Sequence, residues 1–118
     1  MTFTRGNHTK GVGVDLIEVR RFRAFARNKK HAFLNKVFTK KELAYCFQYQ
    51  DPAPHLAGFF AAKESASKAL GVARHPFIEL EVRHRSDGAP EIWHLGKRKT
   101  LQVSISHTKT LATAIAIR

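Results

Sequence analysis

The segment LAGFFAAKESASKALG, residues 56–71, decides the fold. It is rich in alanine and free of proline, and it follows a break in the chain at Asp51-Pro52-Ala53-Pro54. Gly71 stands where a left-handed residue ends a helix at little steric cost. We therefore predict that residues 56–70 form the longest helix of the chain.

The residues before this helix predict one strand and two shorter helices. Apolar residues at 12, 14 and 16 alternate with glycines and Asp15, so residues 11–19 read as a strand with Gly13 and Asp15 on one face. Residues 20–27 carry apolar side chains at helical spacing and arginines on the other side, which predicts a basic amphipathic helix. Thr39-Lys40-Lys41-Glu42 has the capping-box pattern and begins a short helix.

The residues after the long helix predict strands. Residues 78–82 alternate as a half-buried strand, Asp87-Gly88 marks a turn, and residues 92–95 return as the second arm of a hairpin. Residues 103–106 and 111–117 also alternate, and the alanines at 112, 114 and 116 leave room for a helix to pack closely. This order predicts an α+β fold in which an antiparallel β-sheet packs against the long helix.

Length and composition are typical of one globular domain. The chain has 118 residues, 43% hydrophobic and 25% charged, and we assign residues 1–10 to a polar leader and residues 11–118 to a single domain. Cys46 is the one cysteine, which excludes an internal disulfide, and the first ten residues lack the apolar core of a signal peptide. We expect a cytoplasmic protein with no membrane-spanning segment.

The charge predicts a polyanionic partner. The chain has 21 Lys+Arg and 9 Asp+Glu, which gives a formal net charge of +12. Residues 20–41 contain nine basic side chains and no acidic one, a distribution that suits an acidic protein, nucleic acid or an anionic membrane. A solvated face that only keeps the protein soluble is the alternative. The nine are Arg20, Arg21, Arg23, Arg27, Lys29, Lys30, Lys36, Lys40 and Lys41.

Two carboxylates stand in unusual places. Asp15 sits in an otherwise apolar strand, where it needs a partner or a cation, or where it caps the helix that begins near residue 20. Glu64 lies four residues before Lys68 on a partly apolar helix face, the spacing of an ordinary helix-supporting ion pair. Together Asp15 and Glu64 offer the hard oxygen ligands that hold magnesium against phosphates, with neighbouring lysines balancing charge.

The remaining reactive side chains do not indicate a function by themselves. His107 follows the strand residues Ser104-Ile105-Ser106 and precedes Thr108, but a surface histidine in a turn is common and the chain has seven histidines. No His/Cys spacing suggests zinc, and no Gly-rich phosphate loop occurs. Cys46 is expected to pack in the core.

Three segments, in their order and spacing, resemble the holo-acyl-carrier-protein synthase family of 4′-phosphopantetheinyl transferases. They are GVGVDLIEV at 11–19 followed by Arg20-Arg21, FAAKESASKALG at 60–71, and VSISHT at 103–108. Residues 33–42 and Gly88-Ala89-Pro90 are weaker matches. Ser65 stands where the family more often has alanine.

The resemblance implies that the protein transfers the 4′-phosphopantetheine arm of coenzyme A to a serine of an apo acyl carrier protein, a step of fatty acid biosynthesis in lipid metabolism. Adenosine 3′,5′-bisphosphate is released. Asp15 and Glu64 would hold Mg²⁺, with Mn²⁺ as a substitute, and either a metal-bound water or Glu64 would take the serine proton. Lys68 would face the phosphates, and Lys63 would protonate the leaving group. Ser104, His107 and Thr108 would contact the nucleotide.

The resemblance also implies partners. Acyl carrier proteins are acidic, so Arg20, Arg21 and Arg27 become docking candidates, with Arg21 the best match to the family pattern. The family implies a homotrimer with active sites between subunits, and no nucleic acid is expected as a partner. The rival interpretations are a basic RNA-binding or ribosome-associated module, which leaves Asp15 and Glu64 unexplained, and a catalytically silent relative that only binds carrier protein.

Overall fold

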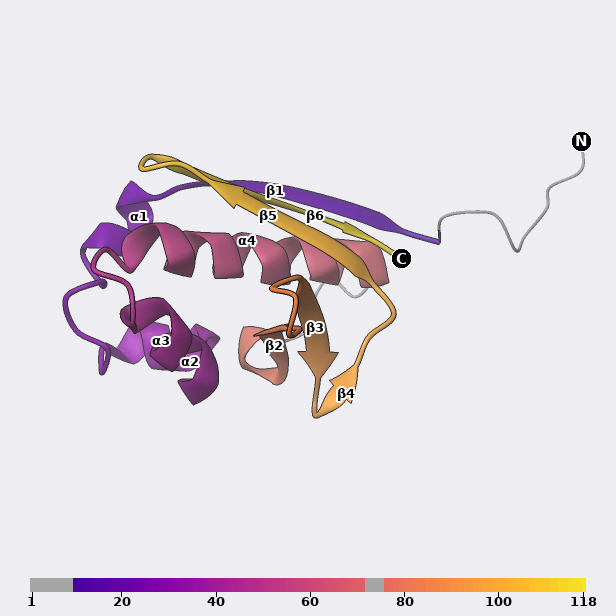
Figure 1. Cartoon of the computed structure of the whole chain (residues 1–118), viewed down its shortest axis with the longest axis horizontal. Coiled ribbons are helices and arrows are strands. Elements are labelled where there is room, and N and C mark those ends of the chain that lie inside the picture. The colour runs from indigo at the N-terminus through magenta and orange to yellow at the C-terminus, as the bar shows by residue number, and fades with distance from the viewer. Residues whose placement is uncertain (1–9, 72–75) are drawn as a thin grey trace, which may run out of the picture.

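The predicted long helix lies at the centre of the molecule. In the computed structural model, which describes residues 10–71 and 76–118, helix α4 (Ala53–Leu70) runs between two small antiparallel sheets (Figure 1). The helix begins three residues earlier than predicted, because proline is tolerated in the first turn. Gly71 ends it with φ of 72°, as predicted. All but the last residue of the predicted leader lie outside the described residues.

One sheet covers α4 along its length. It consists of β1 (Val12–Glu18), β6 (Leu111–Ile117) and β5 (Gln102–His107), in the order β1-β6-β5 with antiparallel neighbours. The predicted alanines of β6, at 112, 114 and 116, are buried and face the helix. Their small side chains let the central strand lie close to α4, as the sequence predicts.

Two glycines bring β1 onto the helix. A Cβ added to Gly11 would stand 2.0 Å from the carbonyl oxygen of Ala69, and one added to Gly13 would stand 1.9 Å from that of Ser65. Only glycine therefore allows this approach of strand and helix backbones. Gly13 and Asp15 share one face, as predicted. This face turns to α4, whereas the apolar residues at 12, 14 and 16 point to solvent.

The predicted hairpin forms a second sheet on the other side of α4. It consists of β2 (Leu80–His84), β3 (Pro90–His94) and β4 (Lys97–Arg98), a short strand that the sequence analysis did not predict. The prediction of a strand at 78–82 began too early, because Phe77–Glu79 form a 3₁₀ turn, η2, that precedes β2. The antiparallel strands thus divide into two sheets.

Three short helices close one end of the molecule: α1 (Arg20–Arg23), α2 (Ala32–Val37) and α3 (Lys40–Phe47) (Figure 1). The prediction of one helix over 20–27 was too long. The N–H groups of Phe25 and Ala26 bond to carbonyls three residues back, so turns replace the helix after α1. Helix α2 was not predicted. The capping box of Thr39 and Glu42 is present and begins α3 as predicted.

The main core lies where these helices meet α4 and the sheets. Phe22 is buried, and its ring packs against those of Phe38 and Phe60. Cys46 is fully buried, as expected. Within the described ranges, no helix is long and apolar enough to cross a membrane.

Candidate functional site

Three of the predicted site residues meet where β1 crosses α4. The Lys68 ammonium reaches from α4 to β1, where it donates a hydrogen bond to the carbonyl of Val14 (2.9 Å) and lies 3.6 Å from Asp15 Oδ1. The hydroxyl of Thr113 on β6 donates to the backbone carbonyl of Asp15 (2.8 Å), which anchors the strand at this point. Glu64 lies one helical turn before Lys68 on the same face.

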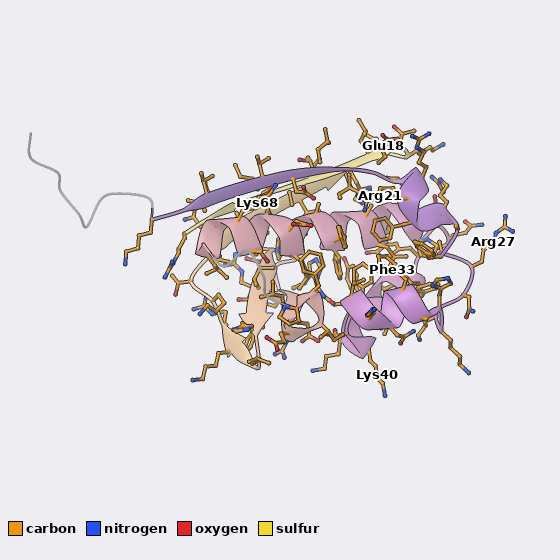
Figure 2. The ribbon with its side chains drawn as sticks, turned by 180° about the vertical axis from the view of Figure 1, so that it is seen from behind. Glu18, Arg21, Arg27, Phe33, Lys40 and Lys68 are labelled. Atoms are coloured by element: carbon orange, nitrogen blue, oxygen red, sulfur yellow. The ribbon has the colours of Figure 1, made fainter. Side chains whose placement is uncertain are left out.

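Arg21 belongs to the same neighbourhood. It follows β1 at the start of α1, its guanidinium lies 5.7 Å from the centre of the Phe60 ring, and its charge acts on both Asp15 and Glu64. Figure 2 shows Arg21 and Lys68 on the side of α4 that β1 covers. Two carboxylates and two cationic side chains are therefore gathered along one edge of the sheet.

The structure decides two alternatives that the sequence left open. Asp15 does not cap a helix, because Val19 is the N-cap of α1 and no side-chain hydrogen bond caps this helix. The ordinary ion pair between Glu64 and Lys68 is absent from the described residues, since the Lys68 ammonium turns to β1 instead. Both carboxylates thus need an explanation other than support of a helix.

The electrostatic environment of the Asp15 and Glu64 carboxylates favours the binding of a cation. Burial raises the pKa of Asp15 against the opposing effect of Lys68. Burial, and then the negative charge of Asp15, raise the pKa of Glu64. Asp15 Oδ2 is buried without a hydrogen-bond partner among the described residues. An ion with a double positive charge would satisfy this oxygen and remove the repulsion between the two carboxylates.

The donor set suits Mg²⁺ rather than zinc. Among the residues that the structure describes, no group of three or more His, Cys, Asp or Glu side chains is arranged to hold a metal. Mg²⁺ is commonly bound by one or two carboxylates, with water and substrate phosphate oxygens completing its shell. Asp15 and Glu64 could therefore hold Mg²⁺ together with the oxygens of a phosphorylated ligand.

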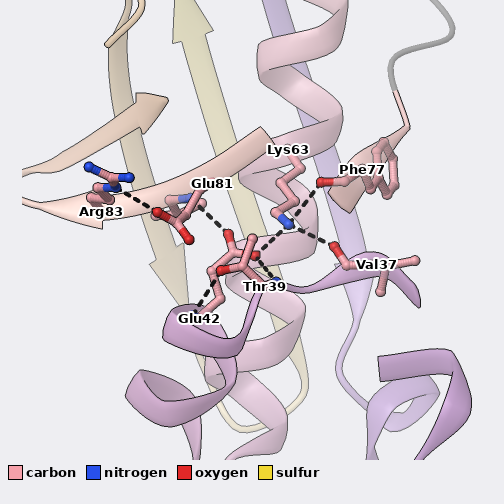
Figure 3. A network of polar contacts seen from close by, with 8 residues as sticks. Val37, Thr39, Glu42, Lys63, Phe77, Glu81 and Arg83 are labelled. Atoms are coloured by element: carbon pink, nitrogen blue, oxygen red, sulfur yellow. Dashed lines mark hydrogen bonds and ion pairs between the residues drawn. The ribbon is translucent and has the colours of Figure 1, made fainter. Parts of the chain in front are cut away.

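Lys63 is not part of this site, and its predicted role as an acid for the leaving group needs correction. Its side chain is fully buried and paired with the buried carboxylate of Glu42 at 2.5 Å. It also donates hydrogen bonds to the carbonyls of Val37 (2.7 Å) and Phe77 (3.0 Å) (Figure 3). Because every contact of the ammonium lies inside the core, no substrate can reach it.

The predicted nucleotide contacts lie on the opposite edge of the sheet. His107 ends β5, and β6 separates this strand from β1 and Asp15. Ser104 is exposed on the outer face of β5, opposite to the face of His107, so the two side chains do not converge. The Thr108 hydroxyl accepts hydrogen bonds from the N–H groups of Thr110 and Leu111 and shapes the turn into β6.

A cavity beside His107 contains residues that sequence reasoning missed. His55 of α4, His84 of β2 and Tyr45 of α3 line it together with His107. They come from four different elements, so no single local pattern in the sequence predicted them. The resemblance offered one signal, the weak match at Gly88-Ala89-Pro90, because Gly88 and Pro90 also line this cavity.

The basic segment forms an exposed surface at the end of the molecule built by α1, α2 and α3. All nine cationic side chains of residues 20–41 are exposed. Arg20 pairs with Glu18 and Arg23 with Asp51, while the other seven form no ion pair with a described residue. Figure 2 shows Arg27 and Lys40 pointing away from the body of the protein.

Comparison with known proteins identifies relatives along nearly the whole chain. The family model of the 4′-phosphopantetheinyl transferase superfamily matches residues 11–117. The holo-[acyl-carrier-protein] synthase of Thermodesulfovibrio yellowstonii is 42% identical over 109 residues, covering 92% of this chain and 96% of the relative. That of Caldanaerobacter subterraneus is 39% identical over 117 residues, covering 90% and 91%.

Solved structures agree with this. A holo-(acyl-carrier-protein) synthase from Bacillus anthracis in complex with CoA (3′,5′-ADP) superposes with a TM-score of 0.77 at 29% identity, covering 92% of this chain and 95% of that one. The Helicobacter pylori enzyme in complex with coenzyme A gives a TM-score of 0.76 at 27% identity, covering 91% and 99%.

Proposed function

Since this chain belongs to the 4′-phosphopantetheinyl transferase superfamily, we propose that it catalyses the family's transfer with Asp15, Glu64 and Lys68 on one edge of the sheet and the His107 cavity on the other. The reaction moves the 4′-phosphopantetheine arm of coenzyme A to a serine hydroxyl of an apo acyl carrier protein. Adenosine 3′,5′-bisphosphate is the leaving group.

The observation that carries the proposed site is the buried, unpartnered Oδ2 of Asp15 beside Glu64. Asp15 and Glu64 would hold Mg²⁺ or Mn²⁺, which when bound polarises the phosphate oxygens and stabilises charge in the transition state. Lys68 is half exposed, with 52% of its side chain accessible, so its ammonium can balance phosphate charge. Glu64, beside the reacting phosphates, would also take the proton of the serine hydroxyl.

We expect transfer only in the presence of Mg²⁺ or Mn²⁺. The test incubates the chain with coenzyme A and an apo acyl carrier protein and follows the mass of the carrier. A gain of one phosphopantetheine group with the cation, its loss in excess chelator and its return on adding Mg²⁺ are the predicted results. Full transfer in chelator would contradict the metal assignment, and no transfer under any condition would contradict the function.

The separation of the two site halves supports a shared active site. Edge strands with one strand between them lie about 10 Å apart, and β6 lies between the two halves. We propose that the chain forms a homotrimer in which the β1 edge of one copy meets the β5 edge of the next. A ring of such head-to-tail contacts closes with three-fold symmetry.

The outer face of the β1-β6-β5 sheet supplies a surface for this assembly. Six exposed apolar residues lie on it, and Val12 and Leu16 are 61% and 66% exposed. Contiguous apolar surface of this kind usually marks an interface. The six are Val12, Val14, Leu16, Leu111, Ile115 and Ile117.

Light scattering should give about three times the chain mass of 13.4 kDa. Leu16→Glu places a charge on the apolar sheet face and should shift the protein to monomers that transfer poorly. Leu95→Glu is the matched control, because Leu95 is 68% exposed but lies in the turn after β3. A wild-type monomer with full activity would contradict the shared site.

We further propose that the exposed basic surface around Arg20, Arg21 and Arg27 docks the acidic carrier protein. Opposite fields raise the encounter rate of two proteins and make it sensitive to salt. Arg27 is the better probe, because Arg21 also acts on the two carboxylates.

Arg27→Glu should raise the KM for carrier protein at least severalfold and leave the KM for coenzyme A unchanged. The effect should shrink as salt increases, since the screening length is about 8 Å at physiological ionic strength. Lys97→Glu on β4 makes the same charge change away from this surface and should have little effect. Equal effects of the two variants would contradict the docking site.

A further inference from the structure

The cavity beside β5 brings three histidines together from three elements. His55 comes from the first turn of α4, His84 from the end of β2 and His107 from the end of β5. Among the described residues that line this cavity, none is a lysine or an arginine. This is unexpected in a chain with 21 Lys+Arg, whose substrate carries several phosphate charges.

Two of these imidazoles stack face to face on tyrosine rings. The His84 ring stacks on Tyr45 at 4.5 Å and 14°, and the His55 ring stacks on Tyr49 at 3.6 Å and 10°. The two tyrosines are joined by a hydrogen bond of 3.1 Å between their hydroxyls. The His55 ring also meets the edge of His107 at 4.8 Å. Stacking fixes each ring plane and leaves the nitrogens at its edge for other partners.

Those nitrogens are available to a ligand. No hydrogen bond joins a ring nitrogen of His55, His84 or His107 to any residue in the described part of the chain. The three rings also do not form a metal-binding group. Imidazole N–H groups that converge on one cavity are suited to the oxygens of a phosphate.

The surroundings of His55 and His84 lower the pKa values of both imidazoles in the free protein. Burial and the charge of His107 lower the pKa of His55, against the opposing effect of Asp51. Burial also lowers the pKa of His84, which packs against Tyr45 of α3 and Phe59 of α4. The pKa of Tyr45 is raised to about 12 by burial, so its hydroxyl brings no charge at neutral pH.

We infer that His55 and His84, with His107, bind a phosphate group of the nucleotide and take up protons as they do so. The inference rests on the proposed function, because coenzyme A supplies the ligand. A phosphate dianion raises the pKa of each imidazole that it contacts, so protons are gained when the pH lies between the free and bound values. The affinity for coenzyme A therefore increases as the pH falls toward 6.5.

Calorimetry with adenosine 3′,5′-bisphosphate tests this directly. Titrations at about pH 7 in two buffers of different ionisation enthalpy measure the protons exchanged on binding, and we expect a net uptake. The Kd should rise with pH by up to about tenfold per pH unit for each proton taken up. A site built from fixed charges would instead release protons, because the phosphate itself has a second pKa near 6 and binds as the dianion. No exchange, release or no binding would each overturn the inference.

Variants identify the groups that gain the protons. His55→Gln and His84→Gln should each reduce the uptake, and the double variant should bind at least about tenfold more weakly at pH 6.5 with a smaller loss at pH 8.5. Tyr49→Phe keeps the ring against His55 and is the matched control, with uptake unchanged. Unchanged uptake in the double variant would overturn the assignment. Transfer to the carrier protein is assayed in parallel to separate this inference from the proposed function. If transfer occurs but the Kd for the nucleotide does not change with pH, only the proton uptake by the histidines is contradicted.

Discussion

Replacing Lys63 with methionine is expected to lower the free energy of unfolding by about 3–5 kcal/mol. The change leaves the fully buried carboxylate of Glu42 without its cation. It also leaves the carbonyls of Val37 and Phe77 without their donor. The loss is large because an unpaired charge in the core is not compensated by water.

The network around this pair explains why it is structural (Figure 3). Glu42 Oε1 accepts from the N–H of Thr39 at 2.9 Å, and its Oε2 accepts from the N–H of Val82 at 2.7 Å. Lys63 and Glu42 therefore connect α4, α3, the end of α2 and the second sheet. Burial lowers the pKa of Lys63 and raises that of Glu42, and each partner opposes the shift of the other.

Denaturant unfolding measures this loss, and Lys68→Met is the matched control. Lys68 lies on the same helix but is half exposed, so water can replace its hydrogen bond and its contact with Asp15, and its replacement should cost no more than about 1 kcal/mol while reducing transfer. Glu42→Gln with Lys63→Met removes both charges and should be less destabilised than the sum of the single variants. A stable Lys63→Met protein without transfer activity would restore the catalytic role that the sequence suggested for Lys63.

Asp15→Asn and Glu64→Gln should each reduce transfer by at least about a hundredfold while the protein remains folded. A bound cation contributes several kcal/mol to stabilising transition-state charge, and each 1.36 kcal/mol corresponds to about a factor of ten in rate. Both replacements keep the shape of the side chain and remove its charge. The kcat with coenzyme A and apo carrier protein in saturating Mg²⁺ is the measurement.

The transfer rate of the wild-type protein should depend on pH in the direction that this role of Asp15 and Glu64 requires. Burial raises the pKa of both carboxyls, and the protonated forms do not hold a cation. The rate should therefore fall as the pH decreases through these raised values, and high Mg²⁺ should shift the fall to lower pH. Glu18→Gln is a control, because Glu18 is an exposed carboxylate on the solvent face of β1. An active Asp15→Asn/Glu64→Gln double variant would return both residues to a structural role.

Local patterns predicted the elements whose causes are local. The capping box at Thr39 and Glu42 satisfies free amides within four residues, so the start of α3 follows from the sequence. Gly71 ends α4 for a similar reason. Residues 20–27 lacked such signals beyond their apolar spacing, and there the predicted helix was too long.

Which face of a strand or helix is buried depends on residues far away in the sequence, so the sequence alone did not predict it. Alternation in β1 does not reveal that the glycine side meets α4, because this follows from the approach of Gly13 to Ser65. Lys63 and Glu64 are neighbours, yet one is fully buried beside Glu42 and the other turns toward Asp15. The three histidines of the cavity come from three elements, which the packing of both sheets on α4 brings together.

Mixing two variants that are impaired at opposite sheet edges tests the central claim, that one active site is built from such edges of neighbouring chains. Asp15→Asn damages the β1 edge and His107→Ala the β5 edge. When the two are unfolded together, refolded and assayed for carrier modification, about a quarter of the sites should contain two intact halves, and a similar fraction of wild-type activity should return. Activity no higher than that of either variant alone would contradict the account.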